Sequence, residues 1–238
     1  MEIDALFEQT YLLLADLLDK QGRSEESVAL LEDGLAKLRA SPRHHETAAM
    51  YSYLGVAQSR TGDVDGALAS NLKVLDLAPG NVGAMRNLTL LYRETGENEE
   101  AIHWGEETLA ATDPARTNEV LQLRQLLAEL YQQTGDTDGA IAQYAAIAQL
   151  APNDVGVQET LYGLYIQKQD LNGAAETLQQ MMTLDPANFA HPYRMAQLLE
   201  QVGQTENALT YAEQALDLAP PDQRTLITDL VAALQGSN

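Results

Sequence analysis

The feature that most constrains the fold is a turn that recurs along nearly the whole chain. Turns containing glycine, or Gln-Asp in one case, fall at residues 22, 62, 96, 135, 169 and 203, so three of the five intervals are 34 residues. A small residue follows each turn at a fixed offset, and Pro79, Pro152, Pro186 and Pro220 form a second recurring mark. Such a period predicts one small structural unit that repeats and stacks on its neighbours.

Each unit is predicted to be a hairpin of two short helices. Glycine readily adopts the left-handed backbone that ends a helix, and Asp63, Asp136 and Asp170 are suited to cap the helix that follows. The prolines prevent the second helix from continuing. We therefore expect six units, at roughly 8–41, 48–81, 82–115, 121–154, 155–188 and 189–222. Apolar residues recur at helical spacing over 223–235, which predicts a final helix covering the last unit.

Two junctions are longer than the period, at 41–47 and 113–120. The extra residues either extend a helix or widen the bend between neighbouring units.

Composition excludes several classes of function. The 238 residues include 35 Asp and Glu but only 14 Lys and Arg, a net charge of −21, which disfavours contact with nucleic acid or anionic membranes. The absence of cysteine excludes disulfides, thiolate metal sites and cysteine nucleophiles. No apolar run approaches the ~20 residues of a transmembrane helix, so direct membrane insertion is not expected. The N-terminus lacks the basic region of a secretion signal, so a cytoplasmic location is predicted. The alternative to this default is that the sequence is a soluble part of a longer, anchored protein.

No catalytic or metal-binding pattern emerges. The densest histidine cluster is His44-His45-Glu46, but adjacent residues of a helix diverge by about 100° and do not face one ion. Glycine-rich phosphate loops and the Gly-x-Ser-x-Gly element are absent. We therefore expect no catalytic residues, no metal and no cofactor, and we predict that the chain is not an enzyme.

A second pattern lies inside the first helix of each unit, where a large residue, leucine, a small residue and tyrosine follow at fixed spacing. Tyr51, Leu54 and Gly55 carry it in one unit, and Leu127 with Ala128 in another. Together with the 34-residue period, this resembles the tetratricopeptide repeat family over nearly the whole chain, although no subfamily is identifiable. The resemblance implies an all-α fold. It would be a right-handed α-solenoid of about six helical hairpins plus a C-terminal capping helix, forming a single domain over residues 1–238.

The resemblance also implies where a partner would bind, because the first helices of such hairpins line a concave groove. The second, fifth, ninth, twelfth and thirteenth places of each unit face that groove. The candidate protein-binding residues, with the adjacent Asn87, are Arg60, Arg86, Asn87, Leu90, Arg93, Gln122, Gln125, Glu129, Glu159 and Tyr193.

Arg60, Arg86 and Arg93 are predicted to converge on one patch, whereas Glu129 and Glu159 make the far part of the groove acidic. Because a guanidinium group is shaped to hold a carboxylate, we hypothesise that a peptide or helix lies along the groove with its acidic end near Arg86 and Arg93. The alternative is that these are ordinary solvated arginines on helix surfaces.

The leading functional hypothesis is a scaffold or adaptor that binds a protein segment and helps to assemble a larger complex. The alternatives are a self-assembling homo-oligomeric scaffold or a regulatory subunit of an enzyme. The chaperone-binding subfamily holds a C-terminal carboxylate with Lys, Asn and Arg. Ser52, Val56, Gln122 and Leu126 occupy most of those places, so that role is not expected.

Overall fold

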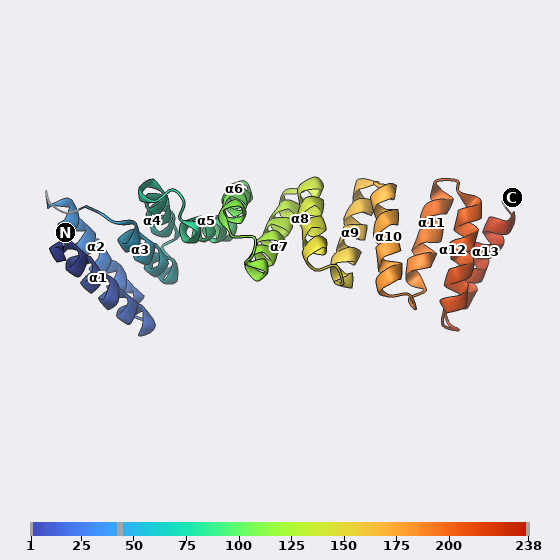
Figure 1. Cartoon of the computed structure of the whole chain (residues 1–238), viewed down its shortest axis with the longest axis horizontal. Coiled ribbons are helices and arrows are strands. Elements are labelled where there is room, and N and C mark those ends of the chain that lie inside the picture. Colours follow the sequence, from blue (N-terminus) through green and yellow to red (C-terminus); the bar gives the residue numbers. More distant parts are fainter. Residues whose placement is uncertain (1, 42–44, 237–238) are drawn as a thin grey trace. The chain divides into compact units, whose positions relative to one another are not determined.

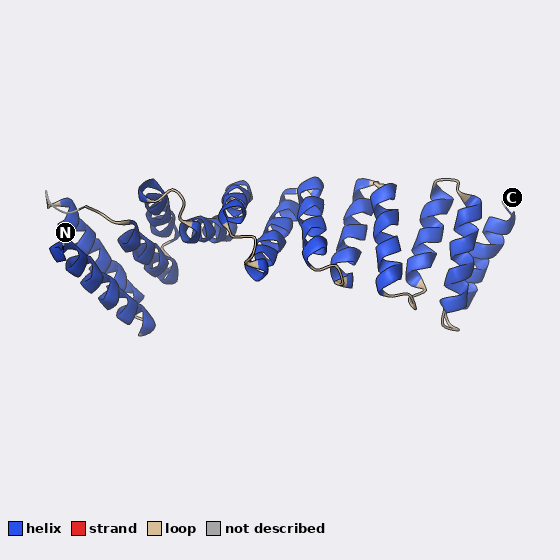
Figure 2. Ribbon diagram, in the orientation of Figure 1, coloured by secondary structure: helices blue, strands red, loops and turns tan. Residues whose placement is uncertain are grey.

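The computed structural model describes residues 2–41 and 45–236, with side chains from residue 7 onward. These residues form thirteen helices that follow one another along the chain, and none of them lies in a strand (Figures 1 and 2). The helices are α1 (Glu2–Lys20), α2 (Ser24–Arg39), α3 (Ala48–Thr61), α4 (Val64–Leu77), α5 (Val82–Thr95), α6 (Asn98–Ala111), α7 (Thr117–Thr134), α8 (Thr137–Leu150), α9 (Val155–Lys168), α10 (Leu171–Leu184), α11 (Ala190–Gln201), α12 (Thr205–Leu218) and α13 (Arg224–Gly236). The predicted all-α hairpin architecture with a C-terminal helix is confirmed.

The turns take the conformation that the glycine spacing predicts. Gly22, Gly62, Gly96, Gly135 and Gly203 all have φ between +72° and +82°. The turn without glycine adopts the same left-handed backbone at Gln169, with φ +60°. A single residue with a side chain can adopt the left-handed backbone at a moderate energetic cost. The hairpin geometry therefore persists at this turn.

The predicted caps are also present. The carboxylates of Asp63, Asp136 and Asp170 each accept a hydrogen bond from a backbone N–H three residues on, at 3.0, 2.9 and 3.0 Å. Asn81 and Asp154 cap α5 and α9 in the same way, at 2.9 and 3.2 Å. These side chains bind backbone N–H groups that a helix leaves unpaired in its first turn.

The chain divides into two compact units, of which the first covers residues 1–134 and contains α1–α7. Each of its helices packs against the next, and α1 also packs against α3. Fully buried leucine and methionine side chains form its interior, among them Leu31, Leu35, Met50, Leu88 and Leu127. Helix α7 begins at Thr117, before the expected repeat boundary at 121, so this long junction extends a helix.

The second unit covers residues 135–238 and contains α8–α13. Neighbouring helices again pack in sequence, around buried Leu178, Met181 and Met195. Helix α13 covers the last hairpin, because its Ile227 and Leu234 are fully buried against alanines of α11 and α12 and the residue after α12. The expectation of one domain over the whole chain stays a prediction.

A close helix contact predicts an unusual effect of an added methyl group. A Cβ at Gly105 of α6 would lie 2.8 Å from Cδ2 of Leu127, which is fully buried on α7. Because Leu127 is enclosed by other side chains, we expect Gly105→Ala to lower the free energy of unfolding by about 1–2 kcal/mol. Thermal or urea denaturation measures this.

The matched control is Gly163→Ala, because a Cβ at Gly163 in α9 would meet nothing within 4 Å. There the usual gain from alanine in a helix should appear, about 0.5 kcal/mol of added stability. An equal gain at Gly105 would show that the contact with Leu127 imposes no constraint.

Candidate protein-binding groove

The first unit has a hollow of ≈ 220 Å³ between α3 and α5, the first helices of two consecutive hairpins. Its lining includes Val56, Ser59, Arg60, Asn87, Leu90 and Glu94. Val56 is 37 % exposed and Leu90 is 41 % exposed. The hollow therefore combines apolar surface with charged and amide groups, and its lining includes three of the candidate binding residues, Arg60, Asn87 and Leu90.

The hollow has a firm wall because α3 and α4 pack closely beneath it. A Cβ at Gly55 would lie 2.8 Å from the amide nitrogen of Asn71, a residue of α4 that is 1 % exposed. The Asn71 amide donates to the backbone oxygen of Ala67 at 2.8 Å, and its oxygen accepts from Asn87 at 3.1 Å. This chain of amides fixes the orientation of Asn87. The repeat register places Asn87 beside the groove, but it does not point to Asn71. The available signal was that the polar side chain of Asn71 interrupts the apolar pattern of α4.

Arg60 lines the hollow and also has a structural partner. Its guanidinium lies 3.2 Å from a carboxylate oxygen of Asp19 on α1, whose side chain is only 6 % exposed. The other carboxylate oxygen of Asp19 is buried, with no hydrogen-bond partner among the described residues. Arg60 therefore supplies the positive charge that a nearly buried carboxylate needs.

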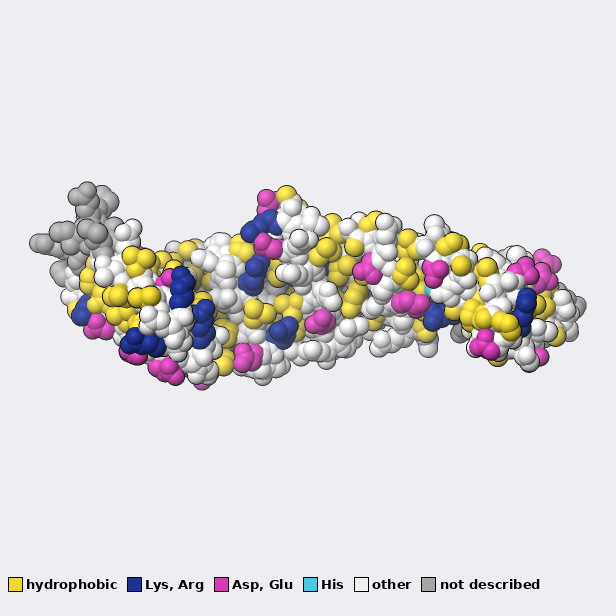
Figure 3. Space-filling view, turned by 90° about the horizontal axis from the view of Figure 1, so that it is seen from below, with side chains coloured by type: hydrophobic (Ala, Val, Ile, Leu, Met, Phe, Trp, Pro, Cys, Tyr) yellow, Lys and Arg dark blue, Asp and Glu magenta, His cyan; other side chains and the backbone are white. Residues whose placement is uncertain are grey.

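The other two arginines lie outside this lining. Arg86 forms an ion pair of 2.8 Å with Glu119 of α7, and Glu119 also pairs with Arg116 at 2.7 Å. Arg93 is exposed and has no ion pair within the part of the chain that the structure describes. Lys and Arg gather mainly over the helices of the first unit on the face drawn in Figure 3. Arg93 is the member of the predicted patch that keeps its charge free for a ligand.

The remaining candidates lie on other helices. Gln122, Gln125 and Glu129 are exposed on α7, in the first unit. Glu159 and Tyr193 belong to the second unit, on α9 and α11.

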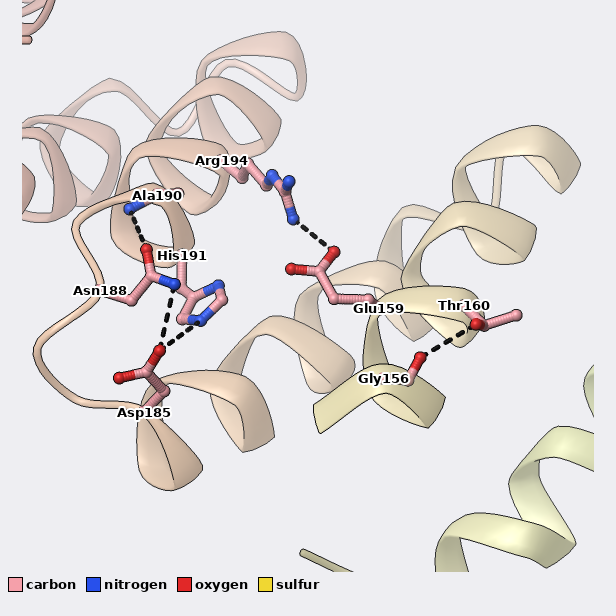
Figure 4. Close-up of polar contacts among 8 residues, drawn as sticks. All are labelled: Gly156, Glu159, Thr160, Asp185, Asn188, Ala190, His191 and Arg194. Carbon is pink, nitrogen blue, oxygen red and sulfur yellow. Dashed lines mark hydrogen bonds and ion pairs between the residues drawn. The ribbon is translucent and has the colours of Figure 1, made fainter. Parts of the chain in front are cut away.

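Arg194 of α11 reaches Glu159 at 2.7 Å (Figure 4). Its guanidinium also lies over the ring of Tyr162, 5.3 Å from the ring centroid. The Tyr193 hydroxyl accepts a hydrogen bond from Gln197 at 3.2 Å. The expected acidic character at Glu159 is thus offset by a paired arginine.

The same region contains a buried histidine that sequence analysis did not distinguish. His191 is 1 % exposed, and neither ring nitrogen has a hydrogen-bond partner among the described residues. A carboxylate oxygen of Asp185 lies 4.0 Å from its Nε2 (Figure 4). Burial lowers the pKa of the His191 imidazole below 6.5, while the carboxylates of Glu159 and Asp185 oppose this change and Arg194 adds to it.

This lowered pKa predicts a loss of stability in mild acid. Below about pH 6.5 the unfolded chain binds a proton at this histidine that the folded chain does not yet bind, so the free energy of unfolding falls as the pH falls. Urea denaturation between pH 7.5 and 5.5 should show this slope. His191→Gln should reduce the slope, whatever its effect on stability at pH 7.5. An unchanged slope in the variant would assign the dependence to other groups.

The described residues contain no group of three or more His, Asp or Glu that could hold a metal ion. His44 lies outside the described residues. The expectation that His44-His45-Glu46 holds no metal ion therefore stays a prediction. Within the described chain, no helix combines the length and apolar character needed to cross a membrane.

Comparison with known families gives consistent matches. Models described as tetratricopeptide repeats match residues 12–82, 82–112, and both 121–154 and 193–222. No curated protein matches the chain significantly.

Two solved structures share the fold at low sequence identity, and a third shows a weaker similarity. "MamA 41-end from Desulfovibrio magneticus RS-1" is 20 % identical with a TM-score of 0.54, over 76 % of this chain and 96 % of that one. A chain in "Structure of Naa15/Naa10 bound to HypK-THB" is 16 % identical with a TM-score of 0.69, over 97 % of this chain but 34 % of that one. YrrB, described as "a TPR protein with an unusual peptide-binding site", is 18 % identical with a TM-score of 0.48, over 84 % and 97 % of the two chains.

Proposed function

The chain belongs to the tetratricopeptide repeat family, and we propose that it is a non-enzymatic scaffold that holds a segment of a partner protein in the hollow between α3 and α5. Proteins of this family mediate protein–protein interactions. The observation that carries the proposal is the hollow itself, where two exposed aliphatic side chains adjoin an arginine, a glutamate and a fixed amide.

The apolar part of the hollow supplies affinity. A single exposed leucine on a surface needs no explanation. Val56 and Leu90, however, come from two helices and flank one concavity, which is the arrangement of a binding site. A volume of ≈ 220 Å³ suits one large side chain of the partner. Burying such a side chain contributes about 1.5–3 kcal/mol.

The polar groups fix the direction of the bound segment. Asn87 uses its amide nitrogen for Asn71, so its carbonyl oxygen is left to accept from a backbone N–H of the partner. Arg93 carries a free positive charge one helical turn beyond Leu90. We place an acidic residue of the partner at Arg93, and we assign Arg86 mainly to its ion pair with Glu119.

Charge reversal tests this direction. Arg93→Glu should weaken binding of a partner captured from cells that produce the protein by about tenfold, which corresponds to about 1.4 kcal/mol, and the difference should shrink as salt is raised. The control Arg23→Glu makes the same change of net charge at the residue that precedes α2, where Arg23 forms an exposed pair with Glu26. Equal affinity of both variants and the unaltered chain would remove the acidic end from the proposal.

The wider role that we propose is that of an assembly factor, which holds one component of a larger complex while another docks. This role needs at least two binding surfaces on one chain. The hollow between α3 and α5 lies within the first unit, so the surfaces of the second unit are left for a second component.

A further inference from the structure

The second unit contains a larger hollow that the sequence gives no reason to expect. Its volume is ≈ 520 Å³, and α8, α9 and α10 all contribute to it. Buried Leu161 and Gln158 of α9 form the floor, together with the half-buried ring of Tyr165. The walls carry small side chains, Ala145 and Ala148 on α8 and Thr177 on α10. Small residues on both walls leave a wide space between two helices that larger side chains would have filled.

Gln158 is the feature of this hollow that points to a ligand. The residue is 3 % exposed, and its amide oxygen is buried with no hydrogen-bond partner among the described residues. Four of the other five units carry an aromatic or apolar residue at the same register, and the fifth carries Arg124; the four are Tyr11, Tyr51, Met85 and Pro192. A buried amide oxygen without a donor is unfavourable for folding. Gln158 belongs to the lining of the hollow, so a rotation of its side-chain amide would bring this oxygen to an N–H group of a bound ligand.

The charge of the second unit selects the kind of ligand. Residues 135–238 contain thirteen Asp and Glu but only three Lys and Arg. All three are engaged: Lys168 pairs with Asp138, Arg194 with Glu159, and Arg224 donates to the backbone oxygen of Leu216. Glu176 is exposed and lies in the lining of the hollow. The surroundings of the hollow therefore attract cations and repel acidic segments.

We propose that this hollow is a second protein-binding site, which takes a tryptophan side chain from a partner segment whose neighbouring residues are Lys or Arg. Tryptophan joins a large apolar ring to a single N–H donor, which matches an apolar space with one unsatisfied acceptor on its floor. The basic neighbours of the tryptophan meet Glu176 and the net negative charge of the unit.

This site is distinct from the predicted groove. In the unit at 155–188, Ile166 and Gln167 are the twelfth and thirteenth places, which face the predicted groove. Successive residues of a helix are about 100° apart, so Gln158, Leu161 and Tyr165 lie on nearly the opposite side of α9 from these two residues. The inference therefore goes beyond the proposed function and stands or falls separately from it.

Selection from a library of random 12-residue peptides on the full chain tests the proposal. We expect enrichment of peptides that combine tryptophan with Lys or Arg. Their affinity should fall at least tenfold in Ala148→Trp, whose new side chain fills the hollow. Ala142→Trp places the same side chain on an exposed part of α8 outside the lining and should leave the affinity unchanged. Circular dichroism confirms that both variants fold.

A second variant separates a binding role of Gln158 from a structural one. Gln158→Leu removes the buried, unsatisfied oxygen, so we expect a higher melting temperature together with at least tenfold weaker binding of the selected peptides. A lower melting temperature with unchanged binding would overturn the assignment. Failure to enrich tryptophan with basic residues, or equal binding to Ala148→Trp, would overturn it as well. Leu90→Asp, in the first unit, should leave these peptides bound, so failure here is distinguishable from failure of the proposed function.

Discussion

Replacing Leu88 by alanine is expected to lower the free energy of unfolding by about 3 kcal/mol, because truncating a fully buried leucine leaves a cavity that the surrounding helices only partly close. Leu88 lies at the centre of α5 and has no exposed surface. Urea denaturation followed by circular dichroism measures the loss. Binding of a captured partner to the folded variant should be nearly unchanged, since Leu88 faces away from the hollow.

Leu90, two residues further along α5, provides the matched control. It is 41 % exposed and lines the hollow. Leu90→Ala should cost less than about 1 kcal/mol of stability but weaken partner binding by about tenfold, which corresponds to about 1.4 kcal/mol. If both variants changed stability and binding in proportion, the separation of core and groove positions on α5 would be wrong.

Arg60→Ala is expected to have the second largest effect, a loss of about 2 kcal/mol in the free energy of unfolding. The variant leaves the carboxylate of Asp19, whose side chain is 6 % exposed, without its positive partner. The expected loss stays below the upper range for buried pairs, because the Arg60 side chain is itself 53 % exposed and water screens the pair.

Arg93→Ala removes an exposed arginine with no ion pair in the described part of the chain, and should change stability by less than about 0.5 kcal/mol. In an Asp19→Asn background, Arg60→Ala should cost much less than it does alone, because no charge is then left unpaired. The same loss in both backgrounds would assign the role of Arg60 to packing and not to its charge.

Local features of the fold could be predicted from the sequence because they depend on neighbouring residues. The left-handed glycines, the caps at Asp63, Asp136 and Asp170, and the final helix all follow from short-range backbone chemistry. The junction at 113–120 left two possibilities open, and the structure extends α7 by one turn. Its residues include no strong helix stop after Pro114.

The candidate site was less predictable, because its residues interact across long stretches of sequence. Arg86 and Glu119 are 33 residues apart, and Arg60 meets Asp19 from another hairpin. A repeat period places each arginine on a face but does not identify its partner. The convergence of the three arginines remains a prediction, although only Arg60 lines the hollow.

The second hollow and the buried histidine depend on side-chain volume at several positions at once. No short motif marks Ala145, Ala148 and Thr177 as the walls of a space, since each is an ordinary helix residue by itself. The available signals were exceptions to the repeat pattern. Gln158 stands at a register where four of the other units carry an aromatic or apolar residue, and His191 occupies a core position of α11.

The central claim is that the first unit binds a partner protein in the hollow between α3 and α5. The most direct measurement is quantitative affinity capture from cells that produce the protein, with the unaltered chain, Leu90→Asp and Leu72→Asp side by side. Leu90 and Leu72 are 41 % and 40 % exposed, but only Leu90 lines the hollow. We predict that Leu72→Asp captures the same partner as the unaltered chain and that Leu90→Asp loses it. Capture of that partner in equal amount by Leu90→Asp would contradict the claim.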